Sequence, residues 1–219
     1  MIFAGSLAQA FISVKIPDIR IKKQAPFTLK AKALLKRRVT VFLFCAFLML
    51  VSHGTYYGFY SIHLEDLGYG KTFIGISWAL ASIAEIVVMI KSDVIFKRFS
   101  TDNVLVFSFM VAAFRWFGLF FATSPASILS LQILHAVTYG TFHVASILYI
   151  DSLTPDETKT LGQSVNNATT YGLGLMVGLV MSGYFFESLG TFKMFMISSL
   201  IALTGGVLLK GSQVVARRL

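Results

Sequence analysis

Long apolar runs, separated by short polar segments, make up most of the sequence. Each run is free or nearly free of charge, and most reach the ~20 residues that a helix needs to cross a hydrocarbon core about 30 Å thick. All four prolines fall outside the runs, as expected of residues that interrupt helices. The pattern predicts six transmembrane helices, at residues 39–64, 72–90, 104–123, 128–150, 161–186 and 194–209.

The start of the fifth predicted helix carries a capping signal. In the segment TPDETKTLG, the spacing predicts Thr154 as the N-cap, Pro155 as the first helical residue and Glu157 as the capping-box partner. We therefore expect this helix to begin at the threonine.

The composition also indicates a chain embedded in a membrane. Hydrophobic residues make up 56% of the 219 residues and charged residues only 13%, with a mean hydropathy of +0.75. Soluble domains carry roughly 25% charged residues. We predict an all-α integral membrane protein in which residues 39–210 form one bundle of six transmembrane helices. The single cysteine, Cys45, leaves no internal disulfide to consider.

The two ends of the chain differ from the bundle. Residues 1–14 are apolar but lack the basic start of a signal peptide, so they are interpreted as the inner end of a preceding transmembrane helix. Residues 15–38 are basic and interrupted by proline, which is typical of a cytoplasmic linker, and residues 211–219 are expected to form a cytoplasmic tail. This order predicts that the chain begins inside a larger protein. A truncated fragment, a homodimer of halves, and a half with a separately encoded partner all remain open.

Positive charge is distributed unevenly along the chain. Of the nineteen Lys and Arg residues, nine precede the first predicted helix and seven more fall on the same side, against only Lys71 and Lys193 on the other. Cationic loops favour the cytoplasmic side. We therefore expect a multi-pass protein of the inner membrane, with both the linker and the carboxyl terminus in the cytoplasm. Because topology accounts for most of the +9 net charge, nucleic acid is not expected as a partner.

Polar and aromatic residues recur on one face of several predicted helices. Ionisable residues at membrane depth are functional-site hypotheses by default. At about 100° per residue, the polar residues of the fourth helix fall within one wedge. Stripes on neighbouring helices predict a shared aqueous cavity for a small-molecule substrate, although an ion pair between Glu85 and Arg115 and packing roles for the histidines are alternatives. The cavity set is His53, Tyr57, Tyr60, Trp78, Gln132, Tyr139 and His143, together with the ionisable residues Glu85, Arg115 and His135.

The motifs of common enzyme classes do not occur. The sequence has no HExxH, no P-loop, and no second intramembrane carboxylate to share acid and base roles with Glu85. We expect no enzyme activity, no cofactor and no metal site. A structural or assembly protein with dry polar stripes, or a passive channel, are the alternative functions.

Several segments carry a resemblance to a known family. The loop IKSDVIFKRFS, with Asp93 followed by Lys97 and Arg98, resembles the gating-loop signature of the major facilitator superfamily, although Phe96 stands where that family usually has glycine. Glu85 and the segments AAFRWFGLFFATSPAS, LQILHAVTYG and MSGYFFESLGTF resemble the carboxyl-terminal six-helix half of that superfamily. The resemblance covers residues 34–209 and is to the branch of lactose permeases, phenylpropionate transporters and nucleoside proton symporters.

This resemblance implies a function. It implies a proton-coupled symporter for a small organic solute such as an aromatic acid, a sugar or a nucleoside, working by alternating access between two six-helix halves. It also implies that Glu85, Arg115 and His135 couple proton movement to substrate binding. Thr138 departs from the lactose permease pattern, which has a second carboxylate there, and the tyrosine-rich first helix is closer to the phenylpropionate branch.

Overall fold

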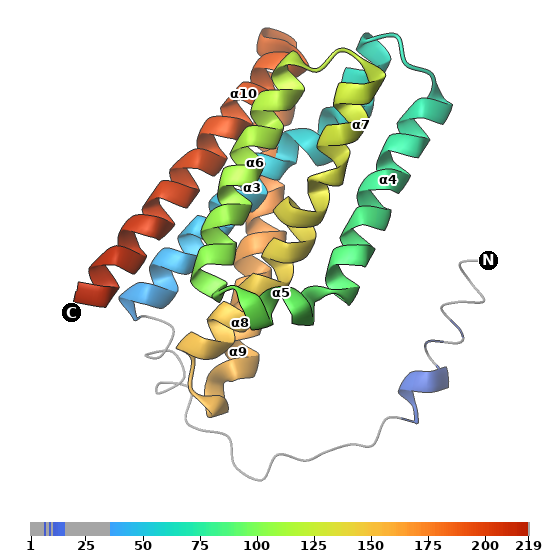
Figure 1. The fold of residues 1–219 in the computed structure, drawn as a ribbon. Helices are drawn as coiled ribbons and strands as arrows, with labels where there is room; N and C mark the ends of the chain where they lie inside the picture. The colour runs from blue at the N-terminus through green and yellow to red at the C-terminus, as the bar shows by residue number, and fades with distance from the viewer. Residues whose placement is uncertain (1–6, 8, 10, 16–35, 219) are drawn as a thin grey trace.

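The computed structural model describes residues 7, 9, 11–15 and 36–218, with side chains up to residue 216 in the last range. Of the predicted preceding helix at 1–14, residues 11–13 are helical, while 1–6, 8 and 10 lie outside the described residues, as do residues 16–35 of the predicted linker. The described chain is all helical, with no strand in it (Figure 1). The first elements are α3 (Arg37–Asp66), α4 (Lys71–Ile90), α5 (Ser92–Arg98), α6 (Thr101–Phe121) and α7 (Pro125–Ile133). They are followed by η1 (Ala136–Thr141), α8 (Phe142–Leu153), η2 (Asp156–Thr158), α9 (Lys159–Asn167), η3 (Ala168–Gly174) and α10 (Leu175–Arg218).

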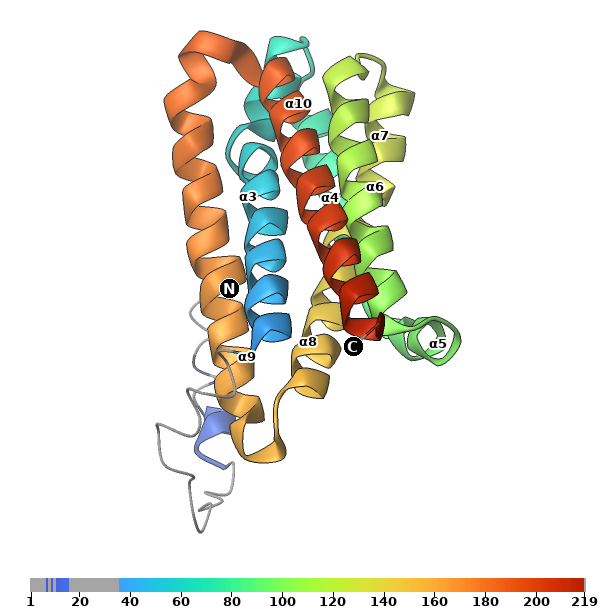
Figure 2. The same ribbon diagram turned by 90° about the vertical axis from the view of Figure 1, so that its left-hand side faces the viewer.

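Five helical segments in the described chain are long and apolar enough to cross a membrane. The fifth, at residues 156–216, holds 61 residues, and Gly190 inside it has non-helical torsion angles, φ 68° and ψ 166°. That combination is open essentially to glycine, because a Cβ would collide with the backbone. The chain reverses direction there, so α10 consists of two antiparallel arms (Figures 1 and 2).

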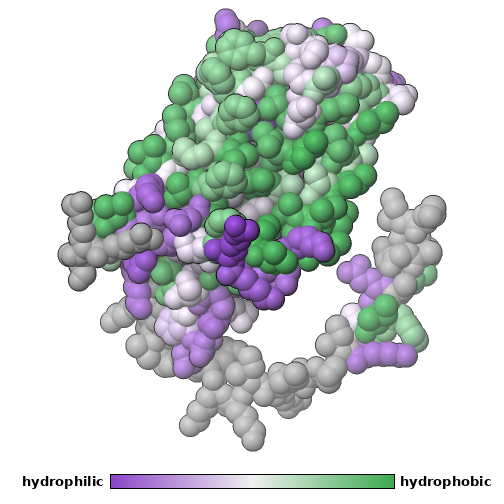
Figure 3. Space-filling model, viewed as in Figure 1, coloured by the Kyte–Doolittle hydropathy of each residue, from purple (hydrophilic) through white to green (hydrophobic). Residues whose placement is uncertain are grey.

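The exterior of the bundle is apolar. Figure 3 shows hydrophobic surface over the length of the helices, with hydrophilic residues concentrated toward the ends. Large side chains such as Ile83, Phe107, Phe114 and Val180 are more than half exposed. In water such a surface would aggregate, whereas lipid tails cover it without cost. The fold is therefore that of a multi-pass membrane protein.

The predicted cap at Thr154 is wrong. The Thr154 hydroxyl donates back to the Ile150 carbonyl at 2.8 Å, so this residue ends α8 instead of starting the next helix. Pro155 is followed by a single 3₁₀ turn, and α9 begins only at Lys159. A threonine hydroxyl can bond a carbonyl of the preceding turn as readily as a following amide, and here the preceding helix provides the partner.

Two segments of the membrane-crossing helices are π-helical. η1 lies in the middle of the fourth crossing segment, between α7 and α8, and η3 lies between α9 and α10 in the fifth. Each inserts extra residues into the helical repeat and therefore rotates the side chains that follow. Such π segments are rare and are frequently found at functional sites.

Close backbone contact joins α3 to the first arm of α10. A Cβ built on Gly54 would overlap the backbone of Gly178, and one built on Gly174 would lie 2.9 Å from the Phe47 carbonyl oxygen. Small residues at such contacts let helices approach closely in a membrane, where packing replaces the hydrophobic effect. α3 is thereby held in the interior of the bundle, which places its aromatic residues beside α4, α6 and η1.

Gly54→Ala is expected to destabilise the fold by about 1–3 kcal/mol or more, because the added methyl meets backbone that no rotamer change can clear. The matched control is Gly183→Ala, since Gly183 also lies in a long helix but a Cβ there meets nothing within 4 Å. Unfolding midpoints measured in detergent would check this. Equal stability of the two variants would contradict the close contact.

Candidate functional site

Arg115 lies on α6 and is fully buried within the bundle. Its Nε donates to the Leu131 carbonyl at 3.0 Å, its Nη2 to Gln132 Oε1 at 3.0 Å, and its Nη1 to Thr138 Oγ1 at 3.2 Å. The acceptors lie on α7 and η1 of the neighbouring crossing segment. A buried cation is tolerated in a membrane when its donors are engaged in this way.

Two aromatic rings cover the guanidinium of Arg115. The centroid of the Tyr56 ring is 4.2 Å from its Cζ, and that of Trp116 is 4.5 Å away. Both rings are held by hydrogen bonds of their own, from the Tyr56 hydroxyl to Gln132 Oε1 at 2.8 Å and from Trp116 Nε1 to Ser52 Oγ at 3.2 Å. The cation is therefore enclosed by its faces as well as its edges and has no surface toward solvent.

His135 lies between Arg115 and Glu85. Arg115 Nη1 is 3.0 Å from His135 Nδ1, and since a guanidinium has only donors, Nδ1 is the acceptor. The neutral ring then carries its hydrogen on Nε2, which is 3.6 Å from Glu85 Oε2. The order of the three residues, which we call the polar triad, is Glu85, His135, Arg115. No direct ion pair joins Glu85 to Arg115 in the described chain.

Glu85 is the member of the polar triad that reaches the surface. Its side chain is 21% exposed, against 5% for His135 and none for the buried Arg115. Gly140 of η1 allows α4 to approach at this point, since a Cβ there would lie 3.1 Å from Glu85 Cγ. The other acidic side chains of the described residues lie at or near helix ends. A carboxyl at membrane depth, accessible from outside the bundle, can exchange a proton.

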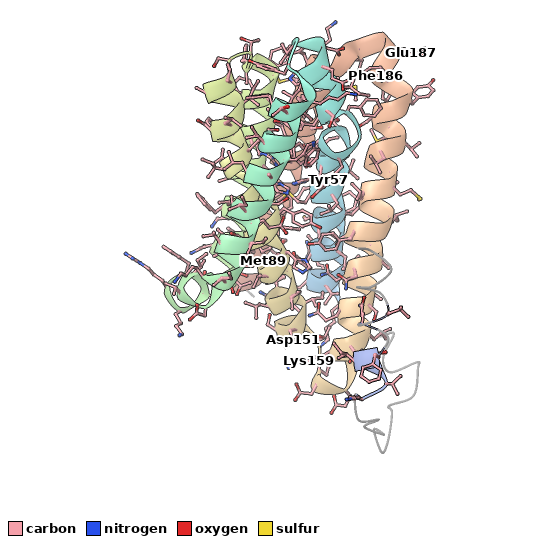
Figure 4. All side chains as sticks on the ribbon, turned by 90° about the vertical axis from the view of Figure 1, so that its right-hand side faces the viewer. Tyr57, Met89, Asp151, Lys159, Phe186 and Glu187 are labelled. Carbon is pink, nitrogen blue, oxygen red and sulfur yellow. The ribbon has the colours of Figure 1, made fainter. Side chains whose placement is uncertain are left out.

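A half-buried aromatic wall flanks Glu85. Tyr139 stacks on His135 with a centroid distance of 5.2 Å, and His143 lies parallel to Tyr139 at 6.4 Å. The Tyr171 hydroxyl and His143 Nδ1 are 2.7 Å apart, which links α8 to η3. Tyr57 meets Tyr139 edge-on at 6.0 Å and lies near the middle of the helices' length, between α4 and the first arm of α10 (Figure 4). Flat rings of this kind suit stacking against an aromatic or sugar face.

The remaining cavity residues predicted from the sequence lie behind this wall. His53, Tyr60 and Gln132 are fully buried, and Trp78 is partly buried. Tyr60 pairs with Ser77 at 2.9 Å, Trp78 Nε1 donates to Ser61 at 3.0 Å, and His53 Nδ1 lies 2.8 Å from the Met49 carbonyl. The three buried residues lie in the interior behind the wall, whereas Trp78 stacks on Tyr57 with a centroid distance of 6.2 Å and keeps part of its ring at the surface.

Sequence reasoning missed Tyr171 and did not anticipate the role of Tyr56. Tyr56 shares its predicted helix face with His53, Tyr57 and Tyr60, but the sequence does not indicate that its ring covers Arg115. Tyr171 lies in a glycine-rich stretch for which the sequence predicts no site residue, and its place opposite His143 depends on η3. One feature of the sequence could have indicated Tyr171, since it is a tyrosine at membrane depth next to small residues.

The predicted gating-loop residues lie apart from the polar triad. Asp93 and Lys97 pair at 3.2 Å on the exposed face of α5, and the Arg98 guanidinium lies 5.7 Å from the Phe99 ring centroid. α5 follows the end of α4 and lies at the same end of the molecule as the start of α3 (Figure 1).

The all-helical fold, the apolar exterior and the enclosed charges define a multi-pass membrane protein with an intramembrane polar site. A family model described as "MFS_1 like family" matches residues 9–197, so the chain belongs to this family of the major facilitator superfamily. The resemblance seen in the sequence is thereby confirmed.

The curated proteins that this chain resembles include three transporters. The probable 3-phenylpropionic acid transporter of Escherichia coli (strain K12) is 31% identical over 163 residues, covering 74% of this chain and 42% of the relative. The putative nucleoside transporter YegT of the same organism is 28% identical, covering 70% and 37%. The uncharacterized transporter YwbF of Bacillus subtilis (strain 168) is 25% identical, covering 75% and 41%. The chain thus spans about two-fifths of the length of these relatives.

Proposed function

We propose that this chain supplies the carboxyl-terminal half of a proton-coupled secondary transporter for a small organic solute. In this proposal the two arms of α10 count as separate crossings, which gives the half six transmembrane helices. The observation that carries the proposal is the polar triad, because a surface carboxyl connected through an imidazole to a sealed cation is suited to holding and releasing a proton. The names of the relatives support transport as the activity.

The roles within the triad follow from its geometry. Glu85 carries the proton, since it alone of the three is accessible. His135 turns Nε2–H toward the carboxylate, 3.6 Å from Glu85 Oε2, and Arg115 fixes the ring by occupying Nδ1. Alternating access would open the Glu85 side to each face of the membrane in turn. Tyr57, Tyr139, His143 and Tyr171 form this half's wall of the substrate path.

An aromatic acid is the substrate class we favour over sugars and nucleosides. The wall presents aromatic rings, and one relative carries the name of a phenylpropionic acid transporter. Because Arg115 is enclosed, the charge that an incoming carboxylate meets in this half is Glu85. Two carboxylates at close range repel unless one is protonated. Substrate anion and proton would therefore bind together, which is the requirement for symport.

The orientation and partner belong to the same proposal. The starts of α3 and α9, the end of α4 and the basic α5 lie at one end of the molecule (Figures 1 and 2), which the positive-inside rule assigns to the cytoplasm of an inner membrane. The wall requires an opposing six-helix half, in the same polypeptide, in a separate chain or in a second copy of this one.

The test is uptake of radiolabelled 3-phenylpropionate by proteoliposomes in which this half is joined to an amino-terminal half. We expect saturable uptake that is driven by an inwardly directed proton gradient and abolished by a protonophore. Flux that neither saturates nor responds to the gradient would indicate a channel. No flux, together with cysteines at Tyr57 and Tyr171 that resist water-soluble thiol reagents, would indicate a structural protein with a dry interior.

A further inference from the structure

A groove lies between the start of α3 and the end of α10, on the side of the bundle away from α4 (Figure 1). It has a volume of about 800 Å³. Both elements reach the same end of the molecule here, as Figure 2 shows. The α3 side is lined by Arg37, Arg38, Thr40, Val41 and Phe44, and the α10 side by Val207, Leu208, Gly211, Ser212, Val215 and Ala216.

The two arginines at the rim of this groove differ from two other basic residues at the same end, which are paired with carboxylates. Lys97 is paired with Asp93 at 3.2 Å, and Lys159 lies 2.8 Å from Asp156 and 3.2 Å from Asp151. For Arg37 and Arg38 no ion pair to an acidic side chain is found among the described residues, although Arg38 lies within hydrogen-bonding reach of the Tyr149 hydroxyl. Two adjacent cations that line a hollow are complementary to an anionic group.

The walls below the arginines are apolar and deep enough for a lipid chain. From Arg37 to Phe44 the helix rises by about 10 Å, and from Val207 to Ala216 by about 14 Å, at roughly 1.5 Å per residue. The side chains along this depth are aliphatic or aromatic apart from two hydroxyls, Thr40 and Ser212. A charged rim over an apolar trough at the membrane edge matches a molecule with an anionic head and a hydrocarbon tail.

We propose that this groove is a binding site for an anionic glycerophospholipid, with the phosphate at Arg37 and Arg38 and one acyl chain against Phe44, Val207 and Val215. The site is independent of the polar triad. It lies where the chain enters its first crossing, so an occupied groove fastens α3 to the second arm of α10. Basic pockets between transmembrane helices recognise such headgroups by charge and by shape together.

The experiment measures phosphatidylglycerol retained by the purified full chain, by native mass spectrometry after reconstitution in nanodiscs of phosphatidylcholine with phosphatidylglycerol. We expect Arg37→Gln/Arg38→Gln to weaken retention roughly thirtyfold, since each cation near an anionic lipid contributes about fivefold. The matched control is Lys97→Gln/Arg98→Gln, which removes the same charge at the same end of the molecule and should retain the lipid. Equal losses in both double variants would show a general surface-charge effect and overturn the site.

A second variant fills the groove without touching its charge. A Cβ on Gly211 meets nothing within 4 Å, so Gly211→Leu introduces a side chain into open space without a backbone clash. We expect it to fold normally and to lose phosphatidylglycerol retention. Unchanged retention would place the lipid elsewhere. A different result would be that Gly211→Leu is less stable than the unsubstituted protein in lipid-free detergent, while phosphatidylglycerol does not stabilise the unsubstituted protein. The groove would then be occupied by residues 16–35 and not by a lipid. If inorganic phosphate stabilises the unsubstituted protein as much as phosphatidylglycerol does, the groove binds the phosphate group and no lipid tail.

Discussion

Arg115→Lys is expected to destabilise the bundle by about 3 kcal/mol or more. The guanidinium satisfies Leu131, Gln132 and Thr138 from three of its edges and is covered on its faces by two rings. An ammonium is a point charge with three donors and cannot reach these acceptors together, so buried acceptors lose their partners at about 1–3 kcal/mol each. The unfolding midpoint in detergent is the measurement.

The control for this substitution is Arg98→Lys, which makes the same chemical change on the exposed α5 and should leave the midpoint within error. The enclosed position of Arg115 also predicts that Arg115→Lys affects uptake through folding. A variant of parental stability with a raised KM for substrate would instead make Arg115 a substrate ligand, and would contradict the enclosure described above.

Glu85→Gln is expected to abolish gradient-driven uptake in the complete transporter while changing stability by less than about 1 kcal/mol. An amide cannot carry a proton, so no gradient can act on it, and the partially exposed side chain contacts the bundle chiefly through His135. Because the amide mimics the protonated acid, exchange of substrate across the membrane without net proton movement should persist. Uptake under an imposed pH gradient and equilibrium exchange are the two measurements.

The matched control is Glu187→Gln, because Glu187 is an exposed carboxylate at the far end of the molecule from the basic loops (Figure 4). Glu187→Gln should show the same gradient-driven uptake as the unsubstituted transporter. His135→Gln should also weaken coupling, since the amide oxygen can accept from Arg115 but an open-chain amide does not hold an N–H toward Glu85 in the fixed position of the imidazole Nε2. Gradient-dependent uptake at parental levels in both Glu85→Gln and His135→Gln would remove the polar triad from the coupling mechanism.

The sequence located most membrane crossings closely, because helix length in a bilayer is fixed by the thickness of the hydrocarbon. The run predicted at 39–64 is α3 at Arg37–Asp66, and the run at 72–90 is α4 at Lys71–Ile90. It also singled out Glu85, Arg115 and His135, since a charge or imidazole at membrane depth is conspicuous in an apolar run. Local signals failed where two partners compete, as at Thr154.

Only the tertiary structure decided how the polar residues are related. Periodicity at 100° per residue places Gln132, His135, Tyr139 and His143 on one face, but η1 rotates the later members, and η3 brings Tyr171 to His143. The pairing of Arg115 with His135, and the enclosure by Tyr56, join residues on different helices. Hydropathy determines that a segment crosses the membrane, because that depends on its own residues. Which polar atom is satisfied and which reaches the surface depends on the approach of neighbouring helices, and that approach is set by contacts such as Gly54 against Gly178, far apart in the chain.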